Sequence, residues 1–123
     1  MRLFQCPCND GNDIDEARFV AYKLHMPTVT RTDEFISWLK NLRDIRARAK
    51  ILQRIDRLAL GNPGDAAPVG QGVSELRIHY GAGYRVYFIQ RGEELVLLLC
   101  GGDKDSQSSD IAFAKKLASE LED

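Results

Sequence analysis

The alternation of apolar and polar residues in VSELRIHYGAGYRVYF, residues 73–88, is the feature that most constrains the fold. A period of two is typical of half-buried β-strands, and the Gly-Ala-Gly sequence at 81–83 has the residues that a turn between strands prefers. The sequence therefore predicts a β-hairpin with a three-residue loop at 81–83. In that hairpin the directly opposed pairs would be Tyr80 with Tyr84, His79 with Arg85, Ile78 with Val86, Arg77 with Tyr87, and Leu76 with Phe88.

The two faces of this predicted hairpin differ in character, because opposed residues of an antiparallel pair share a face. One face is suited to packing and consists of Leu76, Ile78, Tyr80, Tyr84, Val86 and Phe88. The other face carries polar and charged groups, namely Glu75, Arg77, His79, Arg85 and Tyr87. A one-residue slip would mix the two sets, so the pattern itself supports this assignment of faces.

Segments before the hairpin predict a strand and two helices. Residues 27–31 are rich in β-branched side chains and predict a brief strand. The helical spacing of apolar residues then predicts two helices, the first capped by Thr32 or Asp33 and the second following a break at Asp44. The Gly- and Pro-rich stretch 61–72 is predicted to contain neither helix nor strand.

Segments after the hairpin complete the predicted fold. ELVLLLC at 94–100 is apolar on both faces and predicts a central strand. A last amphipathic helix, capped by Ser109 or Asp110, would follow. Helices grouped around an antiparallel meander predict an α+β fold in which two N-terminal helices and a C-terminal helix pack on one face of a small antiparallel sheet. The charged face of the hairpin would then be an open surface.

The chain of 123 residues has the length of one domain, and its first 26 residues differ in composition from the rest. We therefore predict an N-terminal extension at 1–26 and a single domain at 27–123. The extension is either a dispensable segment from an upstream start or a short packed helix at 13–25. Its start lacks the features of a signal peptide, and no apolar run approaches the ~20 residues that a membrane span needs, so a cytoplasmic location and no membrane association are expected.

The three cysteines argue against a disulfide scaffold, because their number is odd. Cys6 and Cys8 could form half of a metal site, but no second Cys/His pair follows at the spacing of metal ligands. The sequence therefore predicts no metal and no other cofactor.

The net charge of −1 is unevenly distributed along the chain. Residues 31–60 contain eight basic and four acidic residues, so the predicted helical region is locally positive. This surface is either an ordinary solvated helix face or a docking site for an acidic partner, and binding to such a site would weaken with salt.

The charged face of the hairpin suits a ligand that carries phosphate. Arginine binds phosphate oxygens in two-point geometry, and histidine exchanges a proton near neutral pH. Such groups, without metal ligands, are what cleavage of RNA by its own 2′-hydroxyl requires, because a base takes the hydroxyl proton and cations stabilise the pentacoordinate phosphorus. The alternative is purely structural, with His79 and Arg85 paired across the strands and Arg77 stacked on Tyr87.

Five motifs follow one another from about Thr28 to Leu121, namely TDEFISWLKNLRD, RIDRLALGNPGD, VSELRIHYGAGYRVYF, ELVLLLCGGDK and DIAFAKKLA. Together they resemble the RelE/ParE superfamily of toxins, and most closely its HigB-like branch. The resemblance implies a RelE-like fold and the toxin of a type II toxin–antitoxin module, which cleaves mRNA as an endoribonuclease, usually on the ribosome. It also implies neutralisation by a cognate antitoxin, expected to be a small helix-turn-helix protein, and contact with operator DNA only through the toxin–antitoxin complex.

The same resemblance implies roles for individual residues. Arg85, in the G-Y-R motif, matches the most characteristic arginine of these toxins, and Lys104 lies where the family has a basic residue just after the last strand. His79 is then the expected base, Arg85 and Lys104 the charge stabilisers, and Arg77 the phosphate anchor. Tyr87 is expected to contact substrate from the same face. RelE itself has lysines where this chain has Arg77 and His79.

Two other functions are compatible with these motifs. ParE toxins share the fold and the G-Y-R arginine but poison DNA gyrase by binding, without nuclease chemistry, so fold alone does not decide. A structural or adaptor domain without toxicity is the third alternative. The E-L-R-x-H strand favours RNA cleavage over both.

Overall fold

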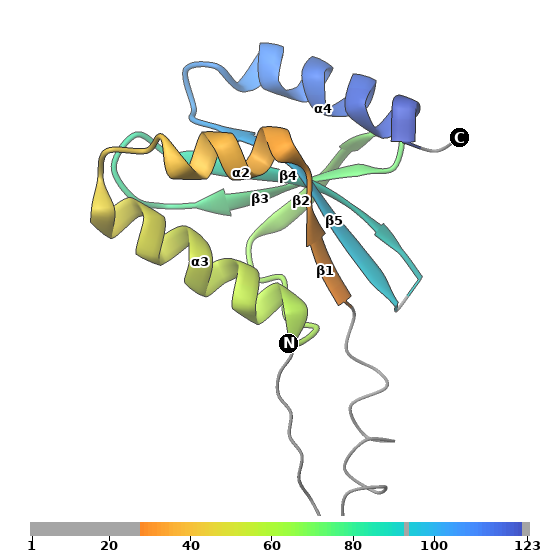
Figure 1. Ribbon diagram of the computed structural model, residues 1–123, viewed down its shortest axis with the longest axis horizontal. Coiled ribbons are helices and arrows are strands. Elements are labelled where there is room, and N and C mark those ends of the chain that lie inside the picture. Colours follow the sequence, from red (N-terminus) through yellow and green to blue (C-terminus); the bar gives the residue numbers. More distant parts are fainter. Residues whose placement is uncertain (1–27, 93, 122–123) are drawn as a thin grey trace, which may run out of the picture.

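The computed structural model describes residues 28–92 and 94–121 (Figure 1). Its elements follow the chain in the order β1 (Thr28–Arg31), α2 (Asp33–Lys40), α3 (Ile45–Ala59), β2 (Ala66–Gly70), β3 (Val73–Ile78), β4 (Tyr84–Arg91), β5 (Leu95–Gly102) and α4 (Gln107–Leu121). The fold is therefore α+β, as the sequence predicts. The predicted extension at 1–26, with Cys6 and Cys8, lies outside the described residues.

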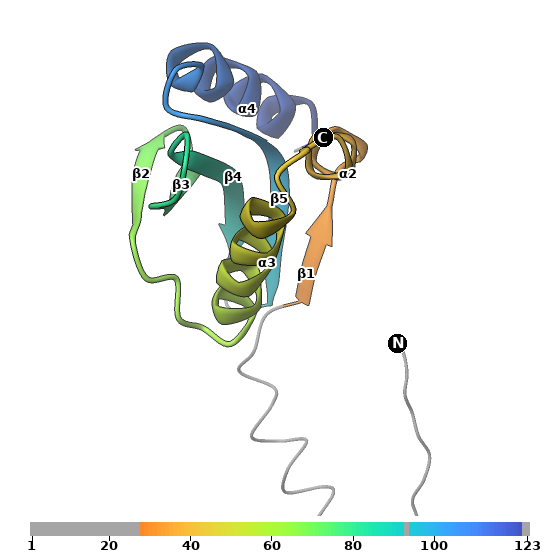
Figure 2. The same cartoon turned by 90° about the vertical axis from the view of Figure 1, so that its left-hand side faces the viewer.

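The five strands form one mixed sheet in the order β1-β5-β4-β3-β2. β1 and β2 lie at its opposite edges (Figure 2). β1 runs parallel to β5, whereas the other neighbouring strands are antiparallel, so the prediction of an antiparallel sheet is corrected at this edge. β5 has a neighbour on each side and is largely buried, which confirms it as a central strand.

The hairpin forms, but its register differs from the predicted one by two residues. Ile78 is opposite Tyr84, and Arg77 is opposite Arg85, so the connection is the five-residue loop 79–83. Gly81 and Gly83 in this loop have positive φ angles of 56° and 77°, which glycine adopts readily. Because side chains alternate with a period of two, a shift of two residues keeps every side chain within the two strands on its predicted face, whereas His79 and Tyr80 lie in the loop.

β2 corrects the prediction that 61–72 contains no regular structure. It pairs antiparallel with β3, and the register is interrupted between Pro68 and Gly70. An edge strand with an irregularity is where a sheet tolerates proline and glycine, since one side of the strand needs no partner.

The N-terminal ends of α2 and α3 agree with the prediction, and that of α4 does not. Thr32 caps α2, and its side-chain oxygen accepts from the backbone N–H of Phe35 at 3.0 Å. Asp44 caps α3 and accepts from Arg46 and Ala47. α4 begins at Gln107, before the predicted caps Ser109 and Asp110.

Helices cover both faces of the sheet, which corrects the prediction that all pack on one face. α2 and α3 pack on the predicted apolar face, in a core of Phe35, Leu39, Ile51, Ile55, Leu58, Leu76, Ile78, Val86, Phe88, Val96 and Leu98. α4 packs on the other face, in a second core of Val73, Tyr87, Ile89, Leu99, Cys100, Ala114, Leu117 and Ala118. Part of the face predicted to be open is therefore interior. Within the described ranges, no helix is both long enough and apolar enough to cross a membrane.

Gly101 in β5 allows the ring of Trp38 to lie directly against the strand. A Cβ atom at residue 101 would lie 2.4 Å from two ring carbons of Trp38, closer than real contacts allow. The indole is also held by Phe35 and Tyr84, whose ring centroids lie 5.8 and 6.5 Å away. Gly101 thus fixes how α2 meets the sheet.

We expect Gly101→Ala to lower the free energy of unfolding by about 1–3 kcal/mol, because the added methyl overpacks the contact with Trp38. Urea unfolding of the full chain measures the effect. In a Trp38→Phe background, which removes the clashing part of the indole, the same substitution should lower the free energy of unfolding by a smaller amount. An equal cost in both backgrounds would show that the indole is not the cause.

Candidate functional site

An open pocket of about 480 Å³ lies where the β3–β4 loop meets the segment after β5. It is lined by His79, Tyr80, Gly81, Ala82, Gly83, Arg85 and Lys104. Three residues with different chemistry therefore share one concave surface: the imidazole of His79, the guanidinium of Arg85 and the ammonium of Lys104. His79 and Lys104 are exposed, whereas the Arg85 side chain is only 15% exposed.

Backbone contacts hold the two sides of this pocket together. The N–H of Lys104 donates to the carbonyl of Ala82 at 3.3 Å, and within the loop the N–H of Gly83 donates to Tyr80 at 3.1 Å. A Cβ atom at residue 83 would lie 3.2 Å from the Cβ of Lys104. Gly83 therefore lets Lys104 approach the loop closely, in addition to supplying the positive φ angle.

A buried carboxylate fixes the guanidinium of Arg85. The Nη1 atom of Arg85 lies 3.2 Å from Oε1 of Glu75, which is 1% exposed. The Nε of Arg85 is buried and has no partner among the described residues. Buried polar groups without a partner are uncommon and costly.

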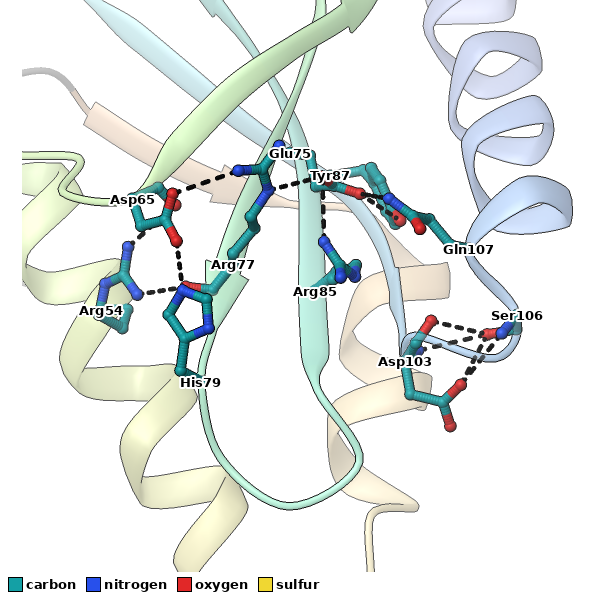
Figure 3. A network of polar contacts seen from close by, with 10 residues as sticks. All are labelled: Arg54, Asp65, Glu75, Arg77, His79, Arg85, Tyr87, Asp103, Ser106 and Gln107. Atoms are coloured by element: carbon teal, nitrogen blue, oxygen red, sulfur yellow. Dashed lines mark hydrogen bonds and ion pairs between the residues drawn. The ribbon is translucent and has the colours of Figure 1, made fainter.

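Glu75 is the centre of a polar network on the sheet face that α4 partly covers (Figure 3). Its Oε1 also accepts from Nε of Arg77 at 3.1 Å, and its Oε2 accepts from Tyr87 at 3.1 Å and from Gln107 at 2.7 Å. Burial alone would raise the pKa of this carboxyl, but the hydrogen bonds from Gln107, Arg77 and Tyr87 and the charge of Arg85 hold it below its ordinary value. Glu75 is therefore an ionised acceptor that links β3, β4 and α4.

A second carboxylate, in the segment before β2, contacts a pocket residue. Asp65 contacts Nε2 of His79, and its Oδ1 lies 3.5 Å from Nη1 of Arg77 (Figure 3). The hydrogen bond from His79 lowers the pKa of Asp65, and the positive charges of Arg77 and Arg54 act in the same direction, against a smaller effect of burial. His79 thus has an anionic partner at one ring nitrogen.

Comparison with known proteins places the chain in a family. Residues 37–119 match the family described as phage-derived protein Gp49-like (DUF891). The chain belongs to the Gp49-like family. It is also 53% identical over 93 residues to a protein of Haemophilus influenzae (strain ATCC 51907 / DSM 11121 / KW20 / Rd) that carries the description "Uncharacterized protein". That match covers 76% of this chain and 94% of the relative. The region matched by the Gp49-like family contains every residue of the pocket and of the polar network.

The structure brings together three of the five site residues predicted for this Gp49-like chain. His79, Arg85 and Lys104 line the pocket. Arg77 lies on the same sheet face but is turned toward Asp65 and Glu75. Tyr87 is fully buried, and burial together with the negative charge of Glu75 raises the pKa of its phenol, so no exposed atom supports its predicted contact with substrate.

The acidic and amide partners of these Gp49-like site residues are not evident from the sequence alone. Glu75 was recognised only as a member of the charged face, and Asp65 only as part of a loop. An acid two residues before an arginine on the same strand face was the available signal for Glu75, since such a pair shares one side of the sheet. Asp65 and Gln107 are distant in sequence, and no local pattern points to them. Within the described residues, no group of three or more His, Cys, Asp or Glu side chains could hold a metal ion.

Proposed function

We propose that the chain is the toxin of a type II toxin–antitoxin module and that it is an endoribonuclease, cleaving mRNA on the ribosome without a metal ion. The observation that carries the proposal is the pocket in which His79, Arg85 and Lys104 meet. It combines a proton acceptor with two cations on a concave surface open to a polymer. Membership of the phage-derived Gp49-like family is consistent with a toxin.

The proposed reaction uses each pocket residue in a defined role. The imidazole of His79 takes the proton of the 2′-hydroxyl, whose oxygen attacks the adjacent phosphorus. Arg85 and Lys104 stabilise the negative charge that develops on the phosphoryl oxygens. The bond to the 5′-oxygen breaks, that oxygen takes a proton from water in the open pocket, and the products are a 2′,3′-cyclic phosphate and a 5′-hydroxyl.

The arrangement of elements supports a RelE-like assignment. Two helices precede the antiparallel strands, and one helix follows them. The E-L-R strand is β3, the G-Y-R motif opens β4, and the G-G-D-K motif ends β5. Gly83 and Arg85 of the second motif and Lys104 of the third line one pocket, and Glu75 of the first motif forms an ion pair with Arg85, which supports a shared function of the three motifs.

The proposed protein partner is a cognate antitoxin, of the small helix-turn-helix type, through which alone the toxin contacts operator DNA. Basic residues are exposed along α2, α3 and their connection, at Lys40, Arg43, Arg46, Lys50 and Arg57. The ammonium of Lys50 lies 5.4 Å from the ring centroid of Tyr80, so this basic surface continues to the rim of the pocket. An acidic antitoxin segment on α3 would therefore lie beside the site it inhibits.

Expression of the chain with parallel readouts tests the proposal. Translation, mRNA integrity and DNA supercoiling are followed in the same culture. We expect loss of intact mRNA with unchanged supercoiling. Relaxed or broken DNA with intact mRNA would indicate a ParE-like gyrase poison, and normal growth at full expression would contradict any toxin assignment.

A further inference from the structure

Asp65 lies outside the strands that carry the pocket residues, yet its carboxylate contacts one of them. It precedes β2, in the segment that follows α3, and it contacts Nε2 of His79 (Figure 3). His79 is 75% exposed and belongs to a loop, so its ring would otherwise be free to turn in solvent. The contact with Asp65 is what gives the imidazole an orientation.

The position of Asp65 is itself fixed by groups from two other elements. The backbone N–H of Arg77 donates to the carbonyl of Asp65 at 2.9 Å. The guanidinium of Arg54, in α3, donates to the carbonyls of Pro63 at 2.9 Å and Asp65 at 3.3 Å, and also to that of Arg77. Arg54 therefore joins α3, the segment before β2 and β3 at one point, and the carboxylate of Asp65 is held at a defined place.

Gly64 permits this arrangement. Its φ angle is +67°, and a Cβ atom at residue 64 would lie 3.1 Å from Nη2 of Arg54. Glycine adopts this conformation readily and leaves room for the guanidinium. Any other residue would be strained by the positive φ angle and crowded against Arg54. The segment before β2 is thus shaped around the contact between Arg54 and the backbone that carries Asp65.

The contact determines which nitrogen of His79 carries a proton. An ionised carboxylate only accepts hydrogen bonds, so the nitrogen facing Asp65 must be protonated. In the neutral imidazole the lone pair then lies on Nδ1. Arg77 and Arg54 contact Asp65, and Arg85 and Lys104 line the pocket together with His79.

We infer that Asp65 is a positioning residue that holds His79 in the Nε2-protonated form and reserves Nδ1 as the atom that accepts the 2′-hydroxyl proton. The inference rests on the proposed function for the identity of the reaction. Its structural part concerns only the tautomer of one histidine, which is measurable whether or not the chain cleaves RNA. The role of Asp65 is indirect, because it acts on the base rather than on the substrate.

The tautomer is measured first, by nitrogen-15 NMR of the full chain at a pH where His79 is neutral. His79→Gln identifies the signal of this residue. We expect the chemical shifts of a protonated Nε2 and an unprotonated Nδ1. In Asp65→Asn, whose amide both donates and accepts, we expect a shift toward a mixture of tautomers while the fold stays intact. A neutral His79 protonated at Nδ1, or a tautomer unchanged by Asp65→Asn, would overturn the inference.

The cleavage rate is measured on the same proteins, with Asp56→Asn as a matched control, because it removes the same charge from an exposed position on α3. We expect Asp65→Asn to be slower by roughly tenfold to a hundredfold, a part of what a positioned base contributes, and Asp56→Asn to be unchanged. Full activity of Asp65→Asn would overturn the positioning role. No cleavage by the unaltered chain would instead overturn the proposed function, and with it the role of Asp65 in that reaction.

Discussion

Replacing Arg85 with alanine is expected to lower the rate of RNA cleavage by about a hundredfold or more, because the pocket loses a cation aimed at the developing charge on phosphorus. The effect should be large because a buried carboxylate fixes the guanidinium before substrate arrives. The measurement is the single-turnover rate on a short RNA or on ribosome-bound mRNA. Loss of growth inhibition at equal expression is the corresponding result in cells.

Two further variants separate chemistry from folding. Arg57→Ala removes an exposed arginine from α3, outside the pocket, and should cleave at the normal rate. Arg85→Lys keeps a positive charge near Glu75 but loses the planar fork, so it should remain folded and still be slow. Normal cleavage by Arg85→Ala would show that the pocket is not the active site.

Replacing Glu75 with glutamine is expected to cause the largest loss of stability, about 3 kcal/mol in the free energy of unfolding. The carboxylate accepts hydrogen bonds from Arg77, Tyr87 and Gln107 and forms an ion pair with Arg85. The amide has almost the same shape but turns an NH₂ group toward some of these donors and leaves the arginines without a counter-charge. Urea unfolding measures the loss, and Glu120→Gln, an exposed change on α4, should have little effect.

The contribution of Glu75 should also depend on pH, with a definite sign. The folded-state pKa of Glu75 lies below its ordinary value of 4.5, so ionised Glu75 stabilises the fold above that pH. This contribution is lost as the pH falls through the folded-state pKa. The difference in stability between the unaltered chain and Glu75→Gln should therefore be full near pH 7 and narrow in acid. A difference that stays constant down to the acid transition would contradict the role given to the ionised carboxylate.

The hairpin shows how far alternation can predict a fold. Alternation identifies which side chains share a face, but it does not fix the register, because pairings two residues apart preserve every face. The predicted three-residue loop and the observed loop 79–83 therefore fit the same pattern. β2 was missed for a different reason, since Pro68 and Gly70 are tolerated only because the strand lies at the edge of the sheet.

The second core explains why part of the site could not be predicted. Tyr87 shares a face with Arg77 and Arg85, and the sequence alone does not show that α4 covers one end of that face. The part of this face that α4 leaves uncovered lies near the β3–β4 loop, and its residues line the pocket. His79 and Arg85 could be predicted because charged residues within an alternating pattern are a local signal. Asp65 and Gln107 depend on long-range packing and are visible only in the fold.

The chemistry of the cleaved ends tests the central claim most directly. Ribosome-bound mRNA is incubated with the purified full chain, and the new 3′ and 5′ ends are characterised, with Arg85→Ala prepared in the same way to exclude a contaminating nuclease. Attack by the 2′-hydroxyl at the pocket predicts 2′,3′-cyclic phosphate and 5′-hydroxyl ends with the unaltered chain and none with Arg85→Ala. Intact mRNA, ends carrying 3′-hydroxyl and 5′-phosphate groups, or equal cleavage by both proteins would contradict it.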